Sequence, residues 1–291
     1  MNGPARPAAN ATMAITRTIG ELRAMIVALR AGGRAIGLIP TMGALHEGHL
    51  SLVRAAIARG DAAVATIFVN PSQFAPNEDF AAYPRDEAAD FAKLSAAGCG
   101  VVFAPSLPEM TPEPSLTSVH VAGLTQGLCG PFRPGHFDGV ASIVTKLLMI
   151  GLPDRAYFGE KDYQQLQVVR RLAFDLSIPA EIVGMPTIRE ADGLAMSSRN
   201  AYLDDSERRI ATGLHRELKK VAREVANGEA SCGAATSRAS QALVAAGFAS
   251  VDYFTVADAA TLAPLERVAG PARVIAAARL GRTRLIDNVA V

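Results

Sequence analysis

The sequence has few cysteines and no excess of charge of either sign. Its 291 residues include 3 cysteines, Cys99, Cys129 and Cys232, which lie far apart and form no CxxC pair. This odd and scattered set disfavours a disulfide framework or a zinc knuckle and favours a reducing cytoplasm. The 29 Lys+Arg and 28 Asp+Glu residues leave a formal net charge of +1. No global electrostatic field therefore recruits nucleic acid or an anionic membrane.

Long apolar runs are also missing. A membrane-spanning helix needs about 18 or more uncharged apolar residues, and the best candidate, Ile143 to Leu152, is short and contains Lys146. Residues 1–13 contain one arginine and no apolar run, so they are not a signal peptide. We expect a disordered N-terminal extension there. The rest, in a chain with 49% hydrophobic residues, is expected to fold as a soluble protein without a membrane or nucleic acid partner.

Several common motifs of nucleotide binding and hydrolysis are absent. The sequence contains no P-loop pattern G-x-x-x-x-G-K-[ST] and no nucleophile elbow G-x-S-x-G. The run Gly98-Cys99-Gly100 begins like a dinucleotide fingerprint, but Phe103 occupies the place of the third glycine. His46 and His49 resemble the zincin pair only superficially, because Leu50 occupies the position of its second histidine.

Hydrophobic periodicity predicts two regions of different architecture. Strands are expected at residues 35–39, 62–69, 101–104, 155–158 and 181–185, and helices at residues 18–31, 47–60, 86–97, 140–150 and 163–176, with a loop over 105–114. Apolar strands that alternate with helices indicate a parallel sheet covered on both faces. After residue 186, helices at 206–225 and 232–246 precede three strands near Val251, Val274 and Leu285. We therefore predict an α/β fold, a Rossmann-like doubly wound parallel sheet with a second, smaller α+β domain.

The strongest local signal is the run Pro40-Thr41-Met42-Gly43-Ala44-Leu45-His46-Glu47-Gly48-His49. It lies between a predicted strand and a predicted helix, at the sheet edge where open α/β folds bind ligands. The helix N-terminus offers backbone N–H groups and a positive dipole end, both suited to phosphate. His46 and His49 project together and can donate hydrogen bonds to phosphate oxygens. Such a pair alone is more often two ordinary surface histidines, and zinc would need a third ligand.

Three further polar loops accompany this run. Asn70–Phe74 follows the second predicted strand of these βαβ units and carries amides suited to a small hydroxylated acid. In the loop over residues 159–165, Lys161 provides a point charge for phosphate, and Asp162 can hold a ribose hydroxyl. The loop over residues 192–200 contains two hydroxyls and an arginine that can close over a triphosphate. Each loop alone is compatible with a capped helix or a solvated turn, but together they indicate a ligand site.

The stretches PTMGALHEGH, FVNPSQF, YPRD, GHFDGV, YFGEKDYQQ and DGLAMSSRN resemble the pantothenate synthetase (pantoate–β-alanine ligase) family. They run from Pro40 to Asn200 in the order and spacing of that family, whereas the C-terminal third resembles it only in length and pattern. HEGH is similar to the HIGH-type signature of the nucleotidyltransferase superfamily, and MSSR lies at the place of its KMSKS-like lid. HxGH alone is moderately specific, whereas the whole set is highly specific.

The resemblance implies a reaction in two steps and a set of binding residues. ATP and pantoate would form pantoyl adenylate and pyrophosphate, and the acyl group would then pass to β-alanine with release of AMP, in vitamin B5 and coenzyme A biosynthesis. Gln73 and Gln165 would bind pantoate, with Gln73 also close to β-alanine. The implied ATP-binding residues are Met42, Gly43, Ala44, Leu45, His46, Glu47, Gly48, His49, Gly159, Glu160, Lys161, Asp162, Ile188, Met196, Ser197, Ser198 and Arg199.

The implied catalytic residues are His49, His46 and Lys161. In families of this type, the residue at the place of His49 is usually given the role of proton donor. We expect His49 to stabilise charge on the departing pyrophosphate whether or not it is protonated. No covalent nucleophile is needed, because the pantoate carboxylate attacks the α-phosphate itself. Catalysis would then be positioning and charge neutralisation. Mg²⁺ would arrive with ATP, with Asp90 as the candidate protein ligand.

The resemblance also implies an organisation for the chain. Residues 14–186 would form a Rossmann-like domain that binds the nucleotide and pantoate, residues 187–291 a smaller α+β lid domain, and two copies a homodimer in the cytoplasm. The sequence departs from the family pattern at residues 147–150, where Leu-Leu-Met-Ile replaces a stretch with an aromatic and a polar residue. We expect this segment to be core and to leave the site unaffected.

Two other functions are compatible with parts of the pattern. Another HxGH nucleotidyltransferase would adenylate a phosphorylated small molecule, but the sequence lacks extra basic residues for a second phosphorylated substrate. A nucleotide-binding regulatory protein without turnover could lose Lys161 or the hydroxyls and arginine of residues 197–199, which this chain keeps. A tRNA-binding role is disfavoured by the near-zero net charge and the missing anticodon domain.

Overall fold

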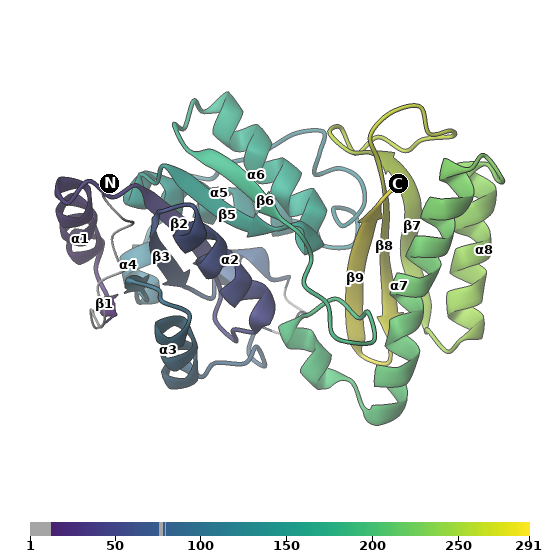
Figure 1. Ribbon diagram of the computed structural model, residues 1–291, viewed down its shortest axis with the longest axis horizontal. Coiled ribbons are helices and arrows are strands. Elements are labelled where there is room, and N and C mark those ends of the chain that lie inside the picture. Colours follow the sequence, from purple (N-terminus) through teal and green to yellow (C-terminus); the bar gives the residue numbers. More distant parts are fainter. Residues whose placement is uncertain (1–12, 76–77, 79) are drawn as a thin grey trace, which may run out of the picture.

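The computed structural model, which describes residues 13–75, 78 and 80–291, contains two β-sheets (Figure 1). The larger sheet is parallel with the order β1-β4-β3-β2-β5-β6, and the smaller is antiparallel with the order β7-β8-β9. The strands of the larger sheet are β1 (Ala14–Thr16), β2 (Ile36–Thr41), β3 (Ala62–Ile67), β4 (Val101–Phe103), β5 (Arg155–Gly159) and β6 (Glu181–Met185). Those of the smaller sheet are β7 (Ser250–Asp258), β8 (Ala272–Leu280) and β9 (Thr283–Ala290).

Helices cover both faces of the larger sheet. The α-helices of this part are α1 (Ile19–Ala31), α2 (Glu47–Ala58), α3 (Glu87–Ala96), α4 (Leu107–Met110), α5 (His136–Gly151) and α6 (Tyr163–Asp175). Side chains of α1, α5 and α6 share one buried cluster with Leu38 of β2, whereas those of α2 and α3 share another with Ile39. Because adjacent strand residues face opposite sides, this division confirms the doubly wound fold.

The smaller sheet has its own core. Helices α7 (Asp205–Ala226) and α8 (Cys232–Ala245) pack against it, with Leu214, Leu218 and Leu243 buried beside Val274 and Ala276 of β8. In Figure 1 both helices lie beside the strands at the end of the molecule that is distant from α1. The prediction of two helices followed by three strands is confirmed. Within the described chain, no helix is long and apolar enough to cross a membrane.

Several predicted boundaries were wrong for identifiable reasons. The predicted loop over 105–114 contains α4, which begins after the N-cap Ser106 and has a proline in its first turn. Helix α5 begins at His136, not at residue 140, because its N-cap Gly135 has a φ of 77° and provides no side-chain cap as a signal. Strand β1, which was not predicted, pairs with β4, and Met13 packs partly buried against the core. Residues 1–12 of the expected extension lie outside the described residues.

Strands β2 and β5 separate toward their carboxyl ends. Strand β2 pairs with β3 along its whole length, from Ile36 to Thr41, but with β5 only at Gly37 and Leu38. Pro40 was predicted to end β2 but lies within it. Successive residues of a strand direct their N–H groups to opposite neighbours, and the Thr41 N–H points to Thr66 of β3. The nitrogen of Pro40 therefore faces β5, where pairing has already ended, so its missing N–H costs no hydrogen bond of the sheet. The sheet therefore opens at its topological switch point, where ligands bind in such folds.

Candidate active site

Two histidines cap the N-terminus of α2. His46 is the N-cap residue, and its Nδ1 accepts the Gly48 N–H at 3.1 Å, while His49 Nδ1 accepts the His46 N–H at 3.3 Å. Imidazoles thus form the reciprocal capping box that a hydroxyl and a carboxylate usually form. A neutral ring with an accepting Nδ1 carries its proton on Nε2, so both rings are Nε2–H donors. Gly48 is required beside them, because a Cβ there would lie 2.8 Å from His46 Cε1.

Both histidines are held in the neutral form. Burial, together with the positive charge of Lys161, lowers the pKa of His46 to about 4. Burial and then the neighbouring His46 lower the pKa of His49 to about 3. The rings are therefore hydrogen-bond donors near neutral pH and do not carry a charge of their own.

Helix α3 holds the loop between β2 and α2 from behind. Both oxygens of Asp90 are engaged, because they accept the N–H groups of Ala44 and Leu45 at 2.8 Å each. Lys93 donates to the Leu45 carbonyl at 2.7 Å. Asp90 is only 2% exposed and does not line the cavity described below. The structure therefore gives Asp90 a structural role and removes it as a candidate Mg²⁺ ligand.

A cavity of about 220 Å³ lies at the opening between β2 and β5. It joins residues from all four polar loops that the sequence singled out. The predicted site residues in its lining are Met42, His46, Gly48, His49, Gln73, Gly159, Lys161, Asp162, Gln165, Ile188, Met196, Ser197, Ser198 and Arg199.

Five predicted ATP-binding residues lie outside this lining. Leu45 is 2% exposed and belongs to the core, and Glu47 forms an ion pair with Arg54 on the surface of α2. Glu160 points to Arg273, with 2.6 Å between Oε2 and Nη2. Gly43 and Ala44 form the loop that Asp90 holds, and both have a positive φ. Gly43, Ala44 and Leu45 therefore support the residues that line the cavity, whereas Glu47 and Glu160 are directed to arginines outside the lining.

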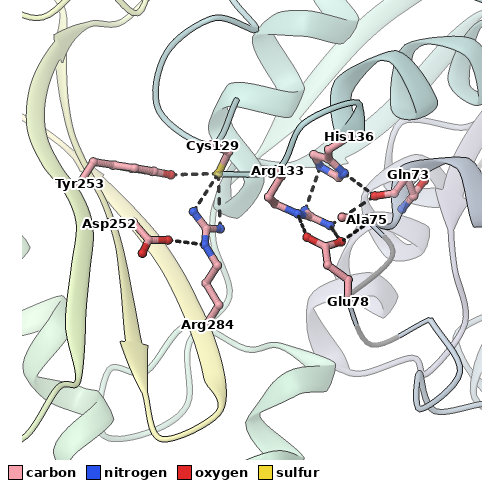
Figure 2. A network of polar contacts seen from close by, with 9 residues as sticks. All are labelled: Gln73, Ala75, Glu78, Cys129, Arg133, His136, Asp252, Tyr253 and Arg284. Atoms are coloured by element: carbon pink, nitrogen blue, oxygen red, sulfur yellow. Dashed lines mark hydrogen bonds and ion pairs between the residues drawn. The ribbon is translucent and has the colours of Figure 1, made fainter. Parts of the chain in front are cut away.

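Among the lining side chains that the sequence analysis missed are Arg133 and His136 (Figure 2). Arg133 forms a double ion pair with Glu78, with N···O distances of 2.6 Å, and donates to His136 Nε2 at 3.0 Å. His136 Nδ1 donates to the Gln73 carbonyl at 2.8 Å. Burial and the charge of Arg133 lower the pKa of His136 to about 4. The stretch GHFDGV, which contains His136, was part of the family resemblance, but the helix was predicted to begin only at Val140.

The two glutamines assigned to pantoate have different supports. Gln73 is 9% exposed, its Oε1 accepts from Asn70 Nδ2 at 3.4 Å, and its Nε2 lies 2.7 Å from Met42 Sδ. Gln165 lines the cavity, whereas its neighbour Gln164 bonds to the backbone of residues 124, 127 and 129. Of the adjacent residues Gln164 and Gln165, only Gln165 is therefore available to a ligand.

Apolar side chains also line the cavity and are here called the apolar wall. It is formed by side chains of α5 together with aromatic rings: Val140, Ile143, Val144, Leu147, Phe68, Phe74 and Phe158. The expectation that residues 147–150 leave the site unaffected was wrong for Leu147, which lines the cavity. Leu148 and Ile150 are core, as expected, but Met149 is 51% exposed, because the four residues span a full turn of the helix.

Charged side chains also line the cavity. Burial of Asp162 opposes its ionisation, but Lys161 and Arg199 outweigh this effect and lower the pKa of the carboxyl. A second cavity of about 660 Å³ shares these three residues and extends toward the smaller sheet, where Arg282 and Arg284 line it. Cations around two connected cavities suit a polyphosphate.

The segment over residues 197–199 contacts Tyr83, the first residue of the stretch YPRD. Ser197 caps the 3-10 helix η3 (Ser198–Tyr202) by accepting the Arg199 N–H at 3.3 Å. Ser198 Oγ lies 3.4 Å from the Tyr83 hydroxyl, and the Arg199 guanidinium lies 5.9 Å from the Tyr83 ring centroid. Tyr83, which received no role from the sequence, therefore supports the predicted lid.

Comparison with known proteins identifies relatives over almost the whole chain. Residues 14–290 match the family model described as pantoate-beta-alanine ligase. The chain is 56% identical over 277 residues to the pantothenate synthetase of Paramagnetospirillum magneticum, covering 95% of this chain and 97% of the relative. It is 55% identical over 280 residues to that of Acidiphilium cryptum, covering 96% and 100%.

Solved structures agree with this family. The pantothenate synthetase of Thermus thermophilus superimposes with a TM-score of 0.89 at 47% identity, covering 95% of this chain and 99% of that one. The pantoate-beta-alanine ligase of Francisella tularensis, complexed with beta-gamma ATP and beta-alanine, has a TM-score of 0.80 at 31% identity. This superposition covers 96% of this chain and 97% of that one.

Stability should depend on pH through the buried histidine His136. An unfolded histidine has a pKa near 6.5, so between pH 6.5 and about 4 the unfolded chain binds more protons than the folded chain. The free energy of unfolding should therefore fall as the pH is lowered through this range, by up to about 1.4 kcal/mol per pH unit from this residue. His136→Asn should reduce this slope in urea titrations over the same pH range, relative to the unsubstituted chain. Equal slopes in the two proteins would contradict this.

Proposed function

The chain belongs to the pantoate-beta-alanine ligase family and is an enzyme that joins pantoate to β-alanine with ATP, and we propose that the cavity between β2 and β5 is its active site. The observation that carries this proposal is the composition of a single lining. It combines a helix N-terminus with two imidazole donors, the cations Lys161 and Arg199, and the amides of Gln73 and Gln165. A nucleotide triphosphate and a small hydroxy acid each find suitable groups there.

ATP is proposed to lie across the N-terminus of α2. The Nε2–H groups of His46 and His49 and the ammonium of Lys161 would bind phosphate oxygens. Ser197, Ser198 and Arg199 would close over the triphosphate, and the second, arginine-lined cavity offers it room. Gly159 and Ile188 would contact the adenosine, with Asp162 on a ribose hydroxyl.

Pantoate is proposed to lie between the glutamines and the apolar wall. Its hydroxyls and carboxylate would bind the amides of Gln73 and Gln165, and its methyl groups would face Val144 and Leu147. β-Alanine would enter beside Gln73. The network of Arg133, His136 and Glu78 fixes the Gln73 carbonyl and so supports the orientation of this residue.

The first step would be an in-line displacement at the α-phosphorus. A pantoate carboxylate oxygen forms the new bond to phosphorus, and the bond from phosphorus to the bridging oxygen of the β-phosphate breaks. The charge that builds on pyrophosphate is stabilised by Lys161 and by His49, which acts as a neutral donor. The neutral amine of β-alanine then attacks the acyl carbon, AMP departs with the oxygen that linked it to the acyl group, and the nitrogen loses one proton to water.

Mg²⁺ is proposed to enter with ATP as part of the substrate. Among residues 13–75, 78 and 80–291, no group of three His, Cys, Asp or Glu side chains could hold a metal ion. Mg²⁺ commonly binds phosphate oxygens, several waters and one or two carboxylates. In such a shell the ion would neutralise phosphate charge, while the Asp162 carboxylate would stay on the ribose hydroxyl.

The organisation of the chain is also a proposal. We propose that residues 14–186 bind the substrates and that residues 187–291 act as a lid, because each part contains one sheet and the smaller sheet forms a separate buried cluster with α7 and α8. A cytoplasmic location is supported by the three cysteines, which are all free and buried. A homodimer is proposed from the family resemblance.

Isotope exchange between ATP and pyrophosphate tests the proposed first step. With pantoate present and β-alanine absent, exchange should occur and should stop when pantoate is omitted, because formation of the adenylate is reversible. If exchange is absent, AMP release with both acids present is measured next. Absence of both signals would overturn the proposal.

His49→Ala and Lys161→Ala should each lose most of the adenylation rate, about 100- to 1,000-fold, because each removes a group that stabilises the departing pyrophosphate. Single-turnover kinetics measure the rate, and circular dichroism should show an unchanged fold. His120→Ala is the control, since His120 is an exposed residue paired with Asp138. Near-normal adenylation in either variant would remove that residue from the mechanism.

The two adjacent glutamines should separate binding from stability. Gln165→Ala should raise the KM for pantoate with little change in melting temperature, because Gln165 lines the cavity. Gln164→Ala should lower the free energy of unfolding by about 1–3 kcal/mol, because it leaves buried backbone groups unpaired. Steady-state kinetics and urea titration measure both. The reverse assignment of the two effects would contradict the proposed pantoate site.

A further inference from the structure

A residue of the smaller sheet contacts the turn that carries Lys161. Asn288 lies on β9 and is 2% exposed. Its Nδ2 donates to the carbonyl of Glu160 at 2.8 Å and to that of Lys161 at 3.0 Å. Both carbonyls belong to the 3-10 helix η2 (Glu160–Asp162), at the end of β5. The carbonyls on both sides of the Lys161 Cα atom thus accept hydrogen bonds from one side chain of the other sheet.

The orientation of the Asn288 amide is fixed by Arg273 of β8. Arg273 Nη1 donates to Asn288 Oδ1 at 2.6 Å, so the NH₂ group of Asn288 must face the two carbonyls. Arg273 Nη2 also donates to Glu160 Oε2 at 2.6 Å, and its guanidinium lies 4.0 Å from the Tyr163 ring centroid. Two neighbouring strands therefore hold both the backbone and a side chain of η2.

The turn η2 has no side-chain cap of its own. Neither Gly159, its N-cap residue, nor Asp162, the N-cap residue of α6, forms a side-chain capping hydrogen bond. Lys161 is nevertheless the main cation of the proposed phosphate site, and its position depends on this short segment. The hydrogen bonds from Asn288 therefore restrain the backbone of η2, as a side-chain cap would do in its place.

The same end of β9 holds the segment that follows β6. Asp287, 3% exposed, accepts both guanidinium nitrogens of Arg189, at 2.6 and 2.9 Å. Arg189 follows Ile188, which lines the cavity. Adjacent residues of one strand thus bind two separate segments of the proposed ATP site.

We propose that Asn288 is a positioning residue of the ligase: it sets the backbone of η2 so that Lys161 meets the phosphates. This inference rests on the role proposed above for Lys161. Asn288 acts through Lys161 and contacts no substrate. The smaller sheet is accordingly a part of the active site's framework in addition to being a lid.

Asn288→Asp tests the inference at almost constant shape. The variant keeps the acceptor for Arg273 but places an oxygen against two carbonyls in place of their donor. We expect kcat for pantoate-dependent ATP–pyrophosphate exchange to fall about 10- to 100-fold, because small displacements of a catalytic group have effects of this size. The KM for pantoate should change by no more than about twofold, since Gln73 and Gln165 lie on other segments.

A double-mutant cycle separates positioning from a general loss of structure. In a Lys161→Ala background, Asn288→Asp should lower the remaining exchange rate by no more than about twofold, because the group it positions is already gone. Equal fractional losses in the two backgrounds would overturn the inference, as would a wild-type rate for Asn288→Asp. A wild-type rate for Lys161→Ala would overturn the role of Lys161 and this inference with it, whereas additive losses leave the role of Lys161 intact.

Two further variants control for folding. Tyr163→Phe removes another hydrogen bond between α6 and the C-terminal part of the chain, from the Tyr163 hydroxyl to the Ala259 carbonyl at 2.8 Å. It should lower the melting temperature but leave kcat within about twofold of wild type. Asn288→Ala removes the same donors without adding charge, and it replaces Asn288→Asp in the cycle if that variant does not fold. A loss of kcat in Tyr163→Phe equal to that in Asn288→Asp would overturn the inference.

Discussion

The unequal pairing of β2 determines where this molecule can bind a ligand. Six residues of β2 pair with β3, but only two pair with β5, so the sheet opens while its base stays closed. The opening lies where the chain turns from building one side of the sheet to building the other. The loop after β2 and the turn after β5 enter this opening from its two sides, with the histidines on one and Lys161 on the other. Every other feature of the site lies around this gap.

The electrostatics of the gap follow from what surrounds it. The imidazoles are partly buried near a lysine and remain neutral, while Asp162 remains charged because neighbouring cations favour the carboxylate. The fixed positive charges come from Lys161, Arg199, Arg282 and Arg284. Such an arrangement suits an anionic substrate, because its phosphates replace water as partners of groups that are already oriented.

Local sequence signals predicted most of the fold because its elements are locally encoded. The capping box of Thr18 and Glu21 marked the start of α1, and apolar runs marked every strand from β2 to β9. The start of α5 could not be predicted, since a glycine in a left-handed conformation caps it and no polar side chain announces it. The extension of β2 through Pro40 depends on the absence of a neighbour on one side, which is a property of the sheet and not of the segment.

The site could be predicted only where a motif carried it. Fourteen of the predicted site residues line the cavity, and all but Ile188 lie in the four loops. The sequence could not show that Leu45 and Glu47 face away from the cavity, because direction depends on how α2 packs. Arg133 and His136 escaped because their roles arise from partners that lie far away in the chain, Glu78 and Gln73. The contacts of Asn288 likewise appear only when the two sheets are placed together.

The histidine capping box gives one pair of rings two duties. Each Nδ1 satisfies a backbone N–H of α2 that would otherwise be unpaired, and each Nε2–H remains for the substrate. In many enzymes catalytic groups reduce stability, so mutations that improve the fold tend to impair the chemistry. Here the groups that bind the phosphates also stabilise the helix that presents them. The stability and the reactivity of this helix end therefore depend on the same two rings and are retained or lost together.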